Sequence, residues 1–256
     1  MRSAAALACM AAATVARGTP PAHAEVCAAC HGAQGRSVSA EIPHLAGQRS
    51  AYLQKQLKAF RGGERKHDLM EPIARQLSDD DIALLATFWS RLPAAGEPDA
   101  PAPAGLRSAM QMPAGFPKDF TVYETVADEG TRVVTLRSAN AQALDAARRG
   151  QAPLPGAVIV SAEYDAAVGA DQQPLRDASG GLKPGKLRAV AGMELRTGWG
   201  EQVPALLRNG DWHYGLWGPQ GESRLRTSHA QCLACHQPQA GNHYVFTWPA
   251  LLKAAR

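Results

Sequence analysis

The stretch Cys27-Ala28-Ala29-Cys30-His31 decides the fold, because the same pattern returns near the end of the chain as Cys232-Leu233-Ala234-Cys235-His236. C-x-x-C-H is the attachment signature of c-type haem, in which two thioethers hold the porphyrin and the histidine binds the iron. The chain has only five Cys and eight His in 256 residues, so two chance matches are negligible. We therefore expect two covalently attached haem c groups, with His31 and His236 as iron ligands.

Other uses of the paired cysteines fit less well. Zinc ribbons separate their two cysteine pairs by about 15–20 residues, far less than the separation of these two motifs. A thioredoxin-type redox pair needs no adjoining histidine, whereas both cysteine pairs here are followed by one. Haem attachment therefore remains the favoured interpretation of Cys27, Cys30, Cys232 and Cys235.

The first 24 residues have the pattern of a secretory signal peptide. Arg2 supplies the positive start, residues 4–16 are apolar, and Ala22-His23-Ala24 is an A-x-A cleavage site. We expect cleavage after Ala24 and a periplasmic location, where haem c is attached after export. The apolar stretch is too short for a membrane span, so none is expected.

Length and composition indicate a two-domain globular protein. The formal net charge is +4 and 20% of residues are charged. Because the basic residues form no run and alternate with no aromatics, a nucleic-acid partner is disfavoured. Residues 96–115 are rich in Pro and Ala and predict a semi-rigid linker. This division leaves an N-terminal domain at 25–95 and a C-terminal domain at 116–256.

The N-terminal domain has the periodicity of helices. Leu53, Leu57 and Phe60 share one face of a helix expected over residues 50–61, which Gly62-Gly63 ends. A second helix begins at Ser78, with Asp81 as its capping partner. Met70 lies between these two helices and is the favoured sixth ligand of the first iron, since a thioether raises the reduction potential. His44 and His67 are the rival ligands.

Four segments of this domain resemble a class I cytochrome c of the small bacterial soluble type. They are C-A-A-C-H-G at 27–32, I-P-H-L-A-G-Q at 42–48, Y-L-x-x-Q-L-x-x-F-R-x-G at 52–63 and M-x-x-I-A-x-x-L-S-D-D-D-I-A-x-L-A at 70–86. The resemblance implies an all-α electron-transfer domain with His31 and Met70 as axial ligands. It also implies that the carbonyl of Pro43 lies near the proximal histidine and orients its ring.

The C-terminal domain changes to the period of strands. Strands are expected over 132–136, 156–161, 189–196 and 212–216, with Trp212, Tyr214 and Leu216 facing one side. Helices are expected over 141–149, around the second haem motif, and from Pro249. The pattern predicts an α+β or mainly antiparallel β haem domain.

This domain resembles cytochrome P-460 and its relative cytochrome c′-β. The likeness rests on P-G-A-V-I-V at 155–160, M-E-L-R-T-G-W-G at 193–200, G-D-W at 210–212, and C-L-A-C-H followed by H-Y-V-F-T at 243–247. The resemblance implies a five-coordinate haem whose open face binds nitric oxide in one branch and hydroxylamine in the other. It also implies a homodimer, as in the c′-β branch. The hydroxylamine-oxidising branch carries a Lys cross-linked to the porphyrin, and here that position falls at Ser161.

Several residues are candidates for the distal side of the second haem. Glu194 or Glu201 lies where the family has a carboxylate, which would act as a base. Arg132 matches an arginine on an early strand and would hydrogen-bond a bound oxide. Met193 or His229 would instead close the iron as a sixth ligand.

The sequence thus predicts an electron-transferring haem joined to a second haem that binds nitric oxide or hydroxylamine, working with a redox partner protein. Whether the second haem also turns its ligand over, as an oxidoreductase, is left open. A plain two-haem electron carrier with a six-coordinate second haem is the alternative.

Overall fold

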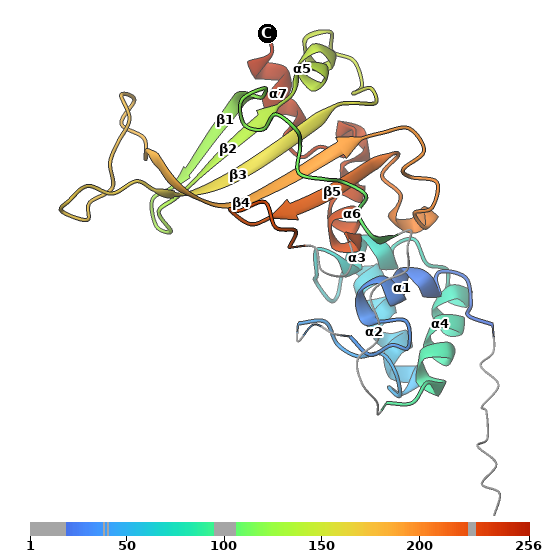
Figure 1. Ribbon diagram of the computed structural model, residues 1–256. Helices are drawn as coiled ribbons and strands as arrows, with labels where there is room; N and C mark the ends of the chain where they lie inside the picture. The colour runs from blue at the N-terminus through green and yellow to red at the C-terminus, as the bar shows by residue number, and fades with distance from the viewer. Residues whose placement is uncertain (1–18, 38, 40, 95–105, 225–228) are drawn as a thin grey trace, which may run out of the picture.

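The computed structural model describes residues 19–37, 39, 41–94, 106–224 and 229–256. Most of the expected signal peptide and half of the expected linker lie outside the described residues. The described chain forms a small helical domain and a larger domain built on a long β-sheet (Figure 1). Among the described residues, no helix is long and apolar enough to cross a membrane.

The N-terminal domain is entirely helical, as the class I cytochrome c resemblance implied. Its helix α2 packs against α3 and α4, and Leu53, Ile82, Leu85 and Trp89 are buried between them. Gly63 follows α2 in a left-handed conformation with φ of 81°, which glycine adopts without strain. The four helices are α1 (Ala24–His31), α2 (Ser50–Gly62), α3 (Met70–Ala74) and α4 (Asp79–Arg91).

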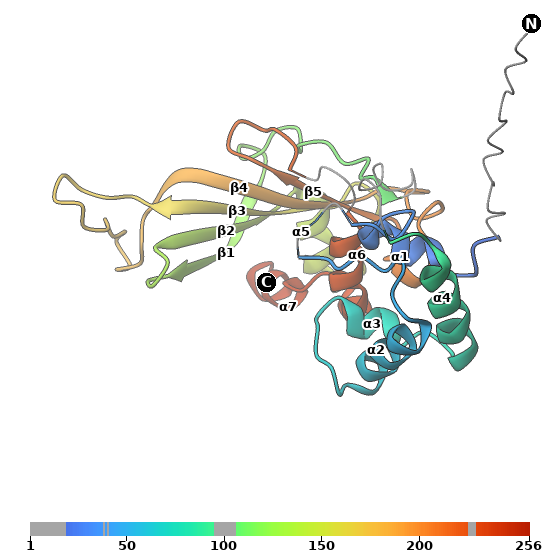
Figure 2. The ribbon, with the colours of Figure 1, turned by 90° about the horizontal axis from the view of Figure 1, so that it is seen from below.

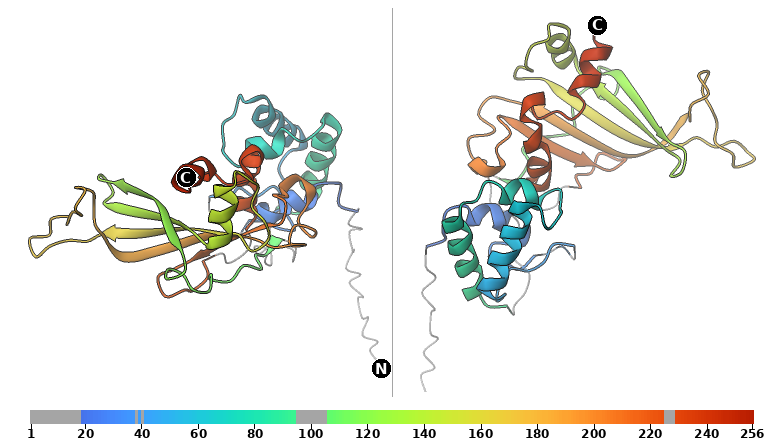
Figure 3. Two further views of the ribbon diagram at one scale, coloured as in Figure 1. Left: turned by 90° about the horizontal axis from the view of Figure 1, so that it is seen from above. Right: turned by 180° about the vertical axis from the view of Figure 1, so that it is seen from behind.

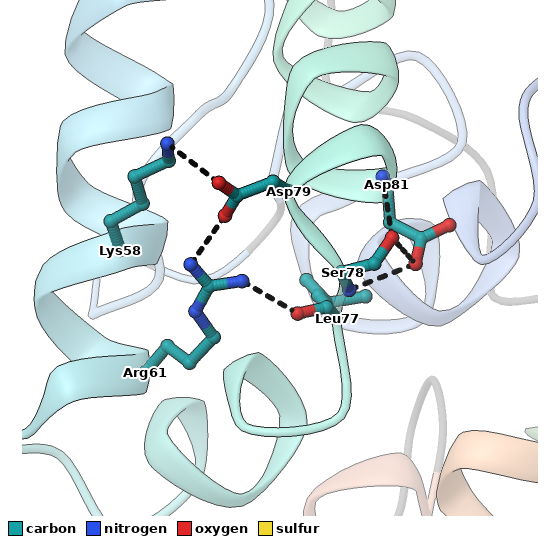
Figure 4. Close-up of polar contacts among 6 residues, drawn as sticks. All are labelled: Lys58, Arg61, Leu77, Ser78, Asp79 and Asp81. Carbon is teal, nitrogen blue, oxygen red and sulfur yellow. Dashed lines mark hydrogen bonds and ion pairs between the residues drawn. The ribbon is translucent and has the colours of Figure 1, made fainter.

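Helix α4 begins with the capping box that the sequence predicted (Figure 4). The backbone N–H of Asp81 donates to the Ser78 hydroxyl at 3.1 Å, and the Asp81 carboxylate accepts from the Ser78 backbone N–H at 2.9 Å. Next to this box, Arg61 of α2 donates to the carbonyl of Leu77 at 2.9 Å and pairs with Asp79. These contacts fix the start of α4 against α2.

The C-terminal domain contains a five-stranded antiparallel sheet whose strands follow their sequence order. Four of the strands correspond to the expected ones, and the sequence did not anticipate the edge strand β1. The strand β4 begins at Pro184, five residues earlier than expected. The strands are β1 (Thr121–Asp128), β2 (Val133–Ala139), β3 (Val158–Ala166), β4 (Pro184–Leu195) and β5 (Trp212–Trp217).

The two faces of the sheet are covered differently. Helices α5 (Ala141–Arg148), α6 (Ala230–His236) and α7 (Trp248–Ala254) lie on one face and leave part of it bare (Figures 2 and 3). Ile159 and Met193 belong to the core on that face, whereas Val158 and Val160 pack with Met110 on the other. The described end of the expected linker therefore packs onto the sheet, and its Leu106 is only 1% exposed. Two short 3₁₀ helices, η2 (Ala205–Leu207) and η3 (Gln237–Asn242), complete the domain.

Candidate functional site

The first C-x-x-C-H motif occupies the last turns of α1. Residues three and four apart on a helix share a side, so Cys27, Cys30 and His31 face the same way. The Nδ1 of His31 donates to the carbonyl oxygen of Pro43 at 2.7 Å. A carbonyl only accepts, so Nδ1 carries the proton and Nε2 is left with a free lone pair. Burial lowers the pKa of His31, which keeps the ring neutral, as a metal ligand must be.

The second motif repeats this arrangement on α6. The Nδ1 of His236 donates to the carbonyl oxygen of Tyr244 at 2.7 Å, and burial again lowers the pKa of the ring. His243 and Tyr244 have φ angles of 57° and 64°, a left-handed conformation that is unfavourable for bulky side chains. These two residues turn the chain back so that the Tyr244 carbonyl meets the histidine. Sequence reasoning missed Tyr244 because a backbone carbonyl leaves no signature in the residue type.

The ring of His236 lies close to two aromatic rings. Its centroid is 4.6 Å from that of Tyr214 on β5 and 4.9 Å from that of Phe246, which is 49% exposed. The buried Asn209 donates through Nδ2 to the Tyr214 hydroxyl at 2.8 Å and to the Leu233 carbonyl of α6 at 3.0 Å. Asn209 thereby ties the helix of the second motif to the sheet. The sequence gave no signal for this role.

The four motif cysteines fit covalent haem attachment. All four are free and half-buried, with no disulfide inside either pair. Burial raises the pKa of Cys27, Cys30 and Cys232 to about 11, so these thiols are protonated at neutral pH. Paired thiols on the side of a helix that also presents a free histidine nitrogen are the donor set of a c-type haem. The residues at both motifs therefore fit that group.

The candidates for the sixth ligand of the first iron differ in what their atoms already do. Met70 is half-buried and begins α3. His67 accepts the backbone N–H of Leu69 at Nδ1 (3.2 Å), and His44 accepts that of Ser37 at Nδ1 (2.8 Å). In each neutral histidine the proton is then on Nε2, so binding iron through Nε2 costs that hydrogen bond. The thioether of Met70 has no such competing demand.

Ser161 faces the same side of the sheet as Tyr214. It is directly opposite Arg137 on β2 and Ala191 on β4. The register continues from Ala191 to Leu216 on β5, two residues from Tyr214, and alternate residues of a strand share a face. Ser161 is half-buried and Ala191 is exposed, so this face has room for a group. Arg137, which pairs with Glu124 of β1, is the arginine on this face.

Arg132, Glu194 and Glu201, the three expected distal residues, do not lie on the sheet face of Ser161 and Tyr214. Arg132 lies in the exposed turn between β1 and β2, and Figure 1 shows this turn at the end of the sheet away from α6. Its φ of 54° is left-handed, and its carbonyl accepts from the backbone N–H of Ala166 at 2.8 Å. Arg137, five residues further along, lies on the sheet face of Ser161, and sequence reasoning did not single it out.

Glu194 and Glu201 are displaced for different reasons. Glu194 is directly opposite Val158 of β3, and both side chains lie on the face of the sheet away from α6. Its neighbour Met193 lies on the α6 face, because successive residues of a strand alternate between faces. Glu194 accepts from the Arg196 Nε at 2.6 Å and lines a cavity of about 470 Å³ with Phe120. Glu201 is exposed in a turn after β4.

His229 and Met193, the candidates for closing the second iron, are both buried. His229 precedes α6, and its Nδ1 accepts the backbone N–H of Tyr214 at 3.4 Å. Its ring also lies 4.6 Å from that of His213. Burial, with the nearby His213, lowers the pKa of His229 to about 3. Met193 is directly opposite Tyr214 of β5, and the two side chains lie on the same face of the sheet.

Two cysteine-histidine helices, each with its histidine held by a carbonyl, define a c-type haem cytochrome. A family model described as cytochrome P460 matches residues 113–247, more than half of the chain, and one described as cytochrome c matches residues 15–92. The chain belongs to the cytochrome P460 family and has a cytochrome c domain before the P460 domain.

Similar proteins include cytochrome c-554(548) of Halomonas halodenitrificans, 45% identical over 67 residues that cover 25% of this chain and 81% of that protein. A thiosulfate dehydrogenase electron acceptor of Stutzerimonas stutzeri is 46% identical over 69 residues, which cover 26% of this chain and 32% of that protein. A reduced cytochrome c4 structure from Pseudomonas stutzeri is 38% identical, with a TM-score of 0.25, and the match covers 26% of this chain and 37% of that one. The matched part of this chain thus covers about a third of the electron acceptor and about a third of the cytochrome c4.

Proposed function

We propose that this chain is a periplasmic dihaem cytochrome that moves electrons through one haem and binds a small nitrogen oxide at the other. The observation that carries the proposal is the matched pair of contacts, from His31 to Pro43 and from His236 to Tyr244. Each contact fixes the tautomer and leaves Nε2 for iron. The haem iron supplies one-electron redox chemistry and, where a coordination position is open, a binding position for a small ligand.

In the N-terminal domain, His31 and Met70 are the proposed axial ligands, with Cys27 and Cys30 as attachment points. A histidine-methionine pair raises the reduction potential. Both positions are taken by side chains, so this half transfers electrons without binding substrate. That role agrees with the relative whose name describes an electron acceptor. A redox protein is therefore its proposed partner.

In the C-terminal domain, Cys232, Cys235 and His236 are the proposed attachment points and proximal ligand. Arg137 is the cationic donor on the adjoining face of the sheet, and a guanidinium donates well to a bound oxide. Ser161 has no amine and so cannot form the lysine cross-link of the hydroxylamine-oxidising branch. Nitric oxide is therefore the favoured ligand, and oxidation of hydroxylamine is the second candidate.

His229 is disfavoured as a sixth ligand of the second iron. Its Nδ1 already accepts the backbone N–H of Tyr214, which leaves the proton of the neutral ring on Nε2. Binding iron through Nε2 would move that proton to Nδ1 and leave a buried backbone N–H unpaired, which costs about 1–3 kcal/mol. Met193 remains the side chain to examine if the second iron is closed.

The first experiment uses the full chain, produced with the haem-attachment machinery. Its reduced visible spectrum is recorded before and after carbon monoxide and nitric oxide are added. Cys27→Ala/Cys30→Ala leaves only the second haem, and Cys232→Ala/Cys235→Ala leaves only the first. We expect both gases to shift the spectrum of the full chain and of the first variant, but not that of the second. If the first variant ignores both gases, the chain is an electron carrier, and Met193→Ala tests the cause.

A second experiment separates a binder from an enzyme. Anaerobic oxidation of hydroxylamine with an artificial electron acceptor is compared between the full chain and the Cys232→Ala/Cys235→Ala variant. We expect no turnover above that of the variant. Turnover that depends on the second motif would make the protein an oxidoreductase. Sedimentation of the same samples tests the homodimer that the c′-β resemblance suggests.

A further inference from the structure

The two domains meet through their haem-attachment helices. Helix α1 packs against α6, and α3 packs against α6 as well. Figures 1 and 2 both show α1 and α6 side by side between the helical domain and the sheet. Ala28 and Ala29 of α1 and Ala230 and Ala234 of α6 are buried in one core that continues across both domains. Small side chains allow two helices to approach closely, because they keep the ridges between the helices low.

The motif cysteines lie at this contact. Cys30 and Cys232 are both half-buried and pack against the shared core. Cys30 belongs to α1 and Cys232 to α6, the two helices that pack against each other across the domain boundary.

A hydrogen bond fixes the orientation of the two domains. The side-chain amide of Gln76, just after α3, donates to the carbonyl of Pro72 at 3.0 Å and to that of Leu206 in η2 at 3.2 Å. In turn, η2 packs against α6. The contact between the attachment helices is thus flanked by a specific polar link across the domains.

We propose that the α1–α6 contact is a built-in electron bridge between the two haem sites, with Cys30 on one helix and Cys232 on the other. This inference rests on the proposed function, which places a haem at each motif. Each thioether would join its cysteine to the edge of its own porphyrin, so the packing of the two attachment helices would bring the two redox groups close together. The haems would supply one-electron chemistry: a ferrous iron at one site would be oxidised while a ferric iron at the other is reduced, and no bond or proton would change place.

The bridge also determines which domain an external redox partner has to contact. Its electrons come from, or go to, the N-terminal domain of the same chain, so the redox partner has to meet only that domain. The side of α1 that packs on α6 is covered by the C-terminal domain. An external partner therefore docks elsewhere on the N-terminal domain.

The test uses the full dihaem chain, with intact mass first confirming two haems. Electron paramagnetic resonance of the oxidised protein measures the magnetic coupling between the irons, which does not depend on driving force. A light-triggered electron donor then reduces the chain, and the transfer between the haems is followed at several protein concentrations and viscosities. We expect clear coupling and a transfer rate that concentration, viscosity and a Gly-Ser insertion within residues 96–104 leave unchanged.

Two variants sharpen the result. Gln76→Glu replaces the donating amide by a carboxylate that faces the Leu206 carbonyl, and we expect a loss of coupling. Gln56→Glu makes the same change at a half-buried glutamine of α2 whose side chain contacts Arg65 of the same domain, and it leaves the coupling unchanged. No coupling, or a rate that falls with viscosity in the unmodified chain, overturns the bridge but not the proposed function. A chain that carries a single haem overturns both.

Discussion

The ring of Tyr214 lies 4.6 Å from the ring of His236, and the Tyr214 hydroxyl accepts a hydrogen bond from Asn209 at 2.8 Å. The proximal histidine is thus held by the Tyr244 carbonyl at Nδ1 and by a tyrosine ring that a buried amide keeps in place. The same amide donates to the Leu233 carbonyl within α6. Asn209 and Tyr214 are therefore positioning residues for His236, the proposed ligand of the second iron.

Asn209→Ala is expected to destabilise the C-terminal domain. The substitution leaves the Tyr214 hydroxyl and the Leu233 carbonyl without their donor in a buried place, which costs about 1–3 kcal/mol. Denaturant unfolding measures the loss, and resonance Raman of the ferrous protein measures the iron-histidine stretch. Asn242→Ala, which removes a half-buried amide that bonds Gln239, is the control. A stretch that does not change in Asn209→Ala would restrict Asn209 to a role in stability.

Met70→Leu is expected to open the first iron and leave the second unchanged. Leucine keeps the volume but has no sulfur, so the iron loses its thioether ligand and the first haem has a lower reduction potential. Potentiometry and the carbon monoxide spectrum of the reduced chain detect both effects. Met112→Leu, a half-buried methionine of the other domain, serves as the control. An unchanged potential would assign the sixth position to His67 or His44.

His229→Gln is expected to reduce the pH dependence of the free energy of unfolding in mild acid. The folded pKa of His229 is about 3, below its ordinary value of 6.5. Below pH 6.5 the unfolded chain takes up a proton that the folded chain refuses, so the free energy of unfolding falls as the pH falls. One such proton is worth about 1.4 kcal/mol per pH unit. Glutamine keeps an acceptor for the Tyr214 N–H and does not titrate in this range.

Urea unfolding at a series of pH values between about 6 and 4 measures that slope. His243→Asn is the control, because asparagine tolerates the left-handed φ of 57° found there. The slope is expected to decrease by about one proton in His229→Gln and to stay unchanged in His243→Asn. Equal slopes in His229→Gln and the unmodified chain would mean that His229 titrates normally in the folded protein.

Ser78→Ala is expected to weaken the N-terminal domain by about 1 kcal/mol, the usual cost of losing a helix cap. The hydroxyl accepts from the Asp81 backbone N–H at 3.1 Å, and the Asp81 carboxylate bonds Ser78 in return. These bonds lower the pKa of Asp81, so they stabilise above pH 3.8 and are lost as the pH falls further. Thermal unfolding at neutral pH measures the cost. Ser90→Ala, near the end of the same helix, gives the background value.

The parts of the fold that follow from local chemistry were predictable. Covalent attachment requires two cysteines and a histidine within five residues, so both motifs are visible in the sequence. The continuous apolar run within 156–161 predicted β3, which has a core on both faces, and the alternating residues of 212–216 predicted β5. The edge strand β1 has no such alternation, since most of its residues are exposed, and it was missed.

The parts that depend on register or on the backbone were not predictable. Glu194 and Met193 are neighbours in sequence, yet strand alternation sends them to opposite faces of the sheet. Arg132 lies in a turn and Arg137 within β2, and telling them apart required knowing where the turn after β1 ends. The Tyr244 carbonyl acts through the backbone. The packing of α1 against α6 joins segments about two hundred positions apart, and only the tertiary structure brings them together.

Ser161→Lys is expected to change the second haem from a c′-β-like group toward a cross-linked one. Ser161 is half-buried on the sheet face of Tyr214, opposite Arg137 and Ala191, where a lysine has room to extend. After the holoprotein is exposed to peroxide, mass spectrometry of its digest is expected to find the peptide of β3 joined to that of α6. Glu163→Lys places a lysine on the same face two residues further along and is expected to give no such product. Cross-linking in both variants would show that the reaction is not specific to position 161, and cross-linking in neither would place Ser161 away from the porphyrin edge.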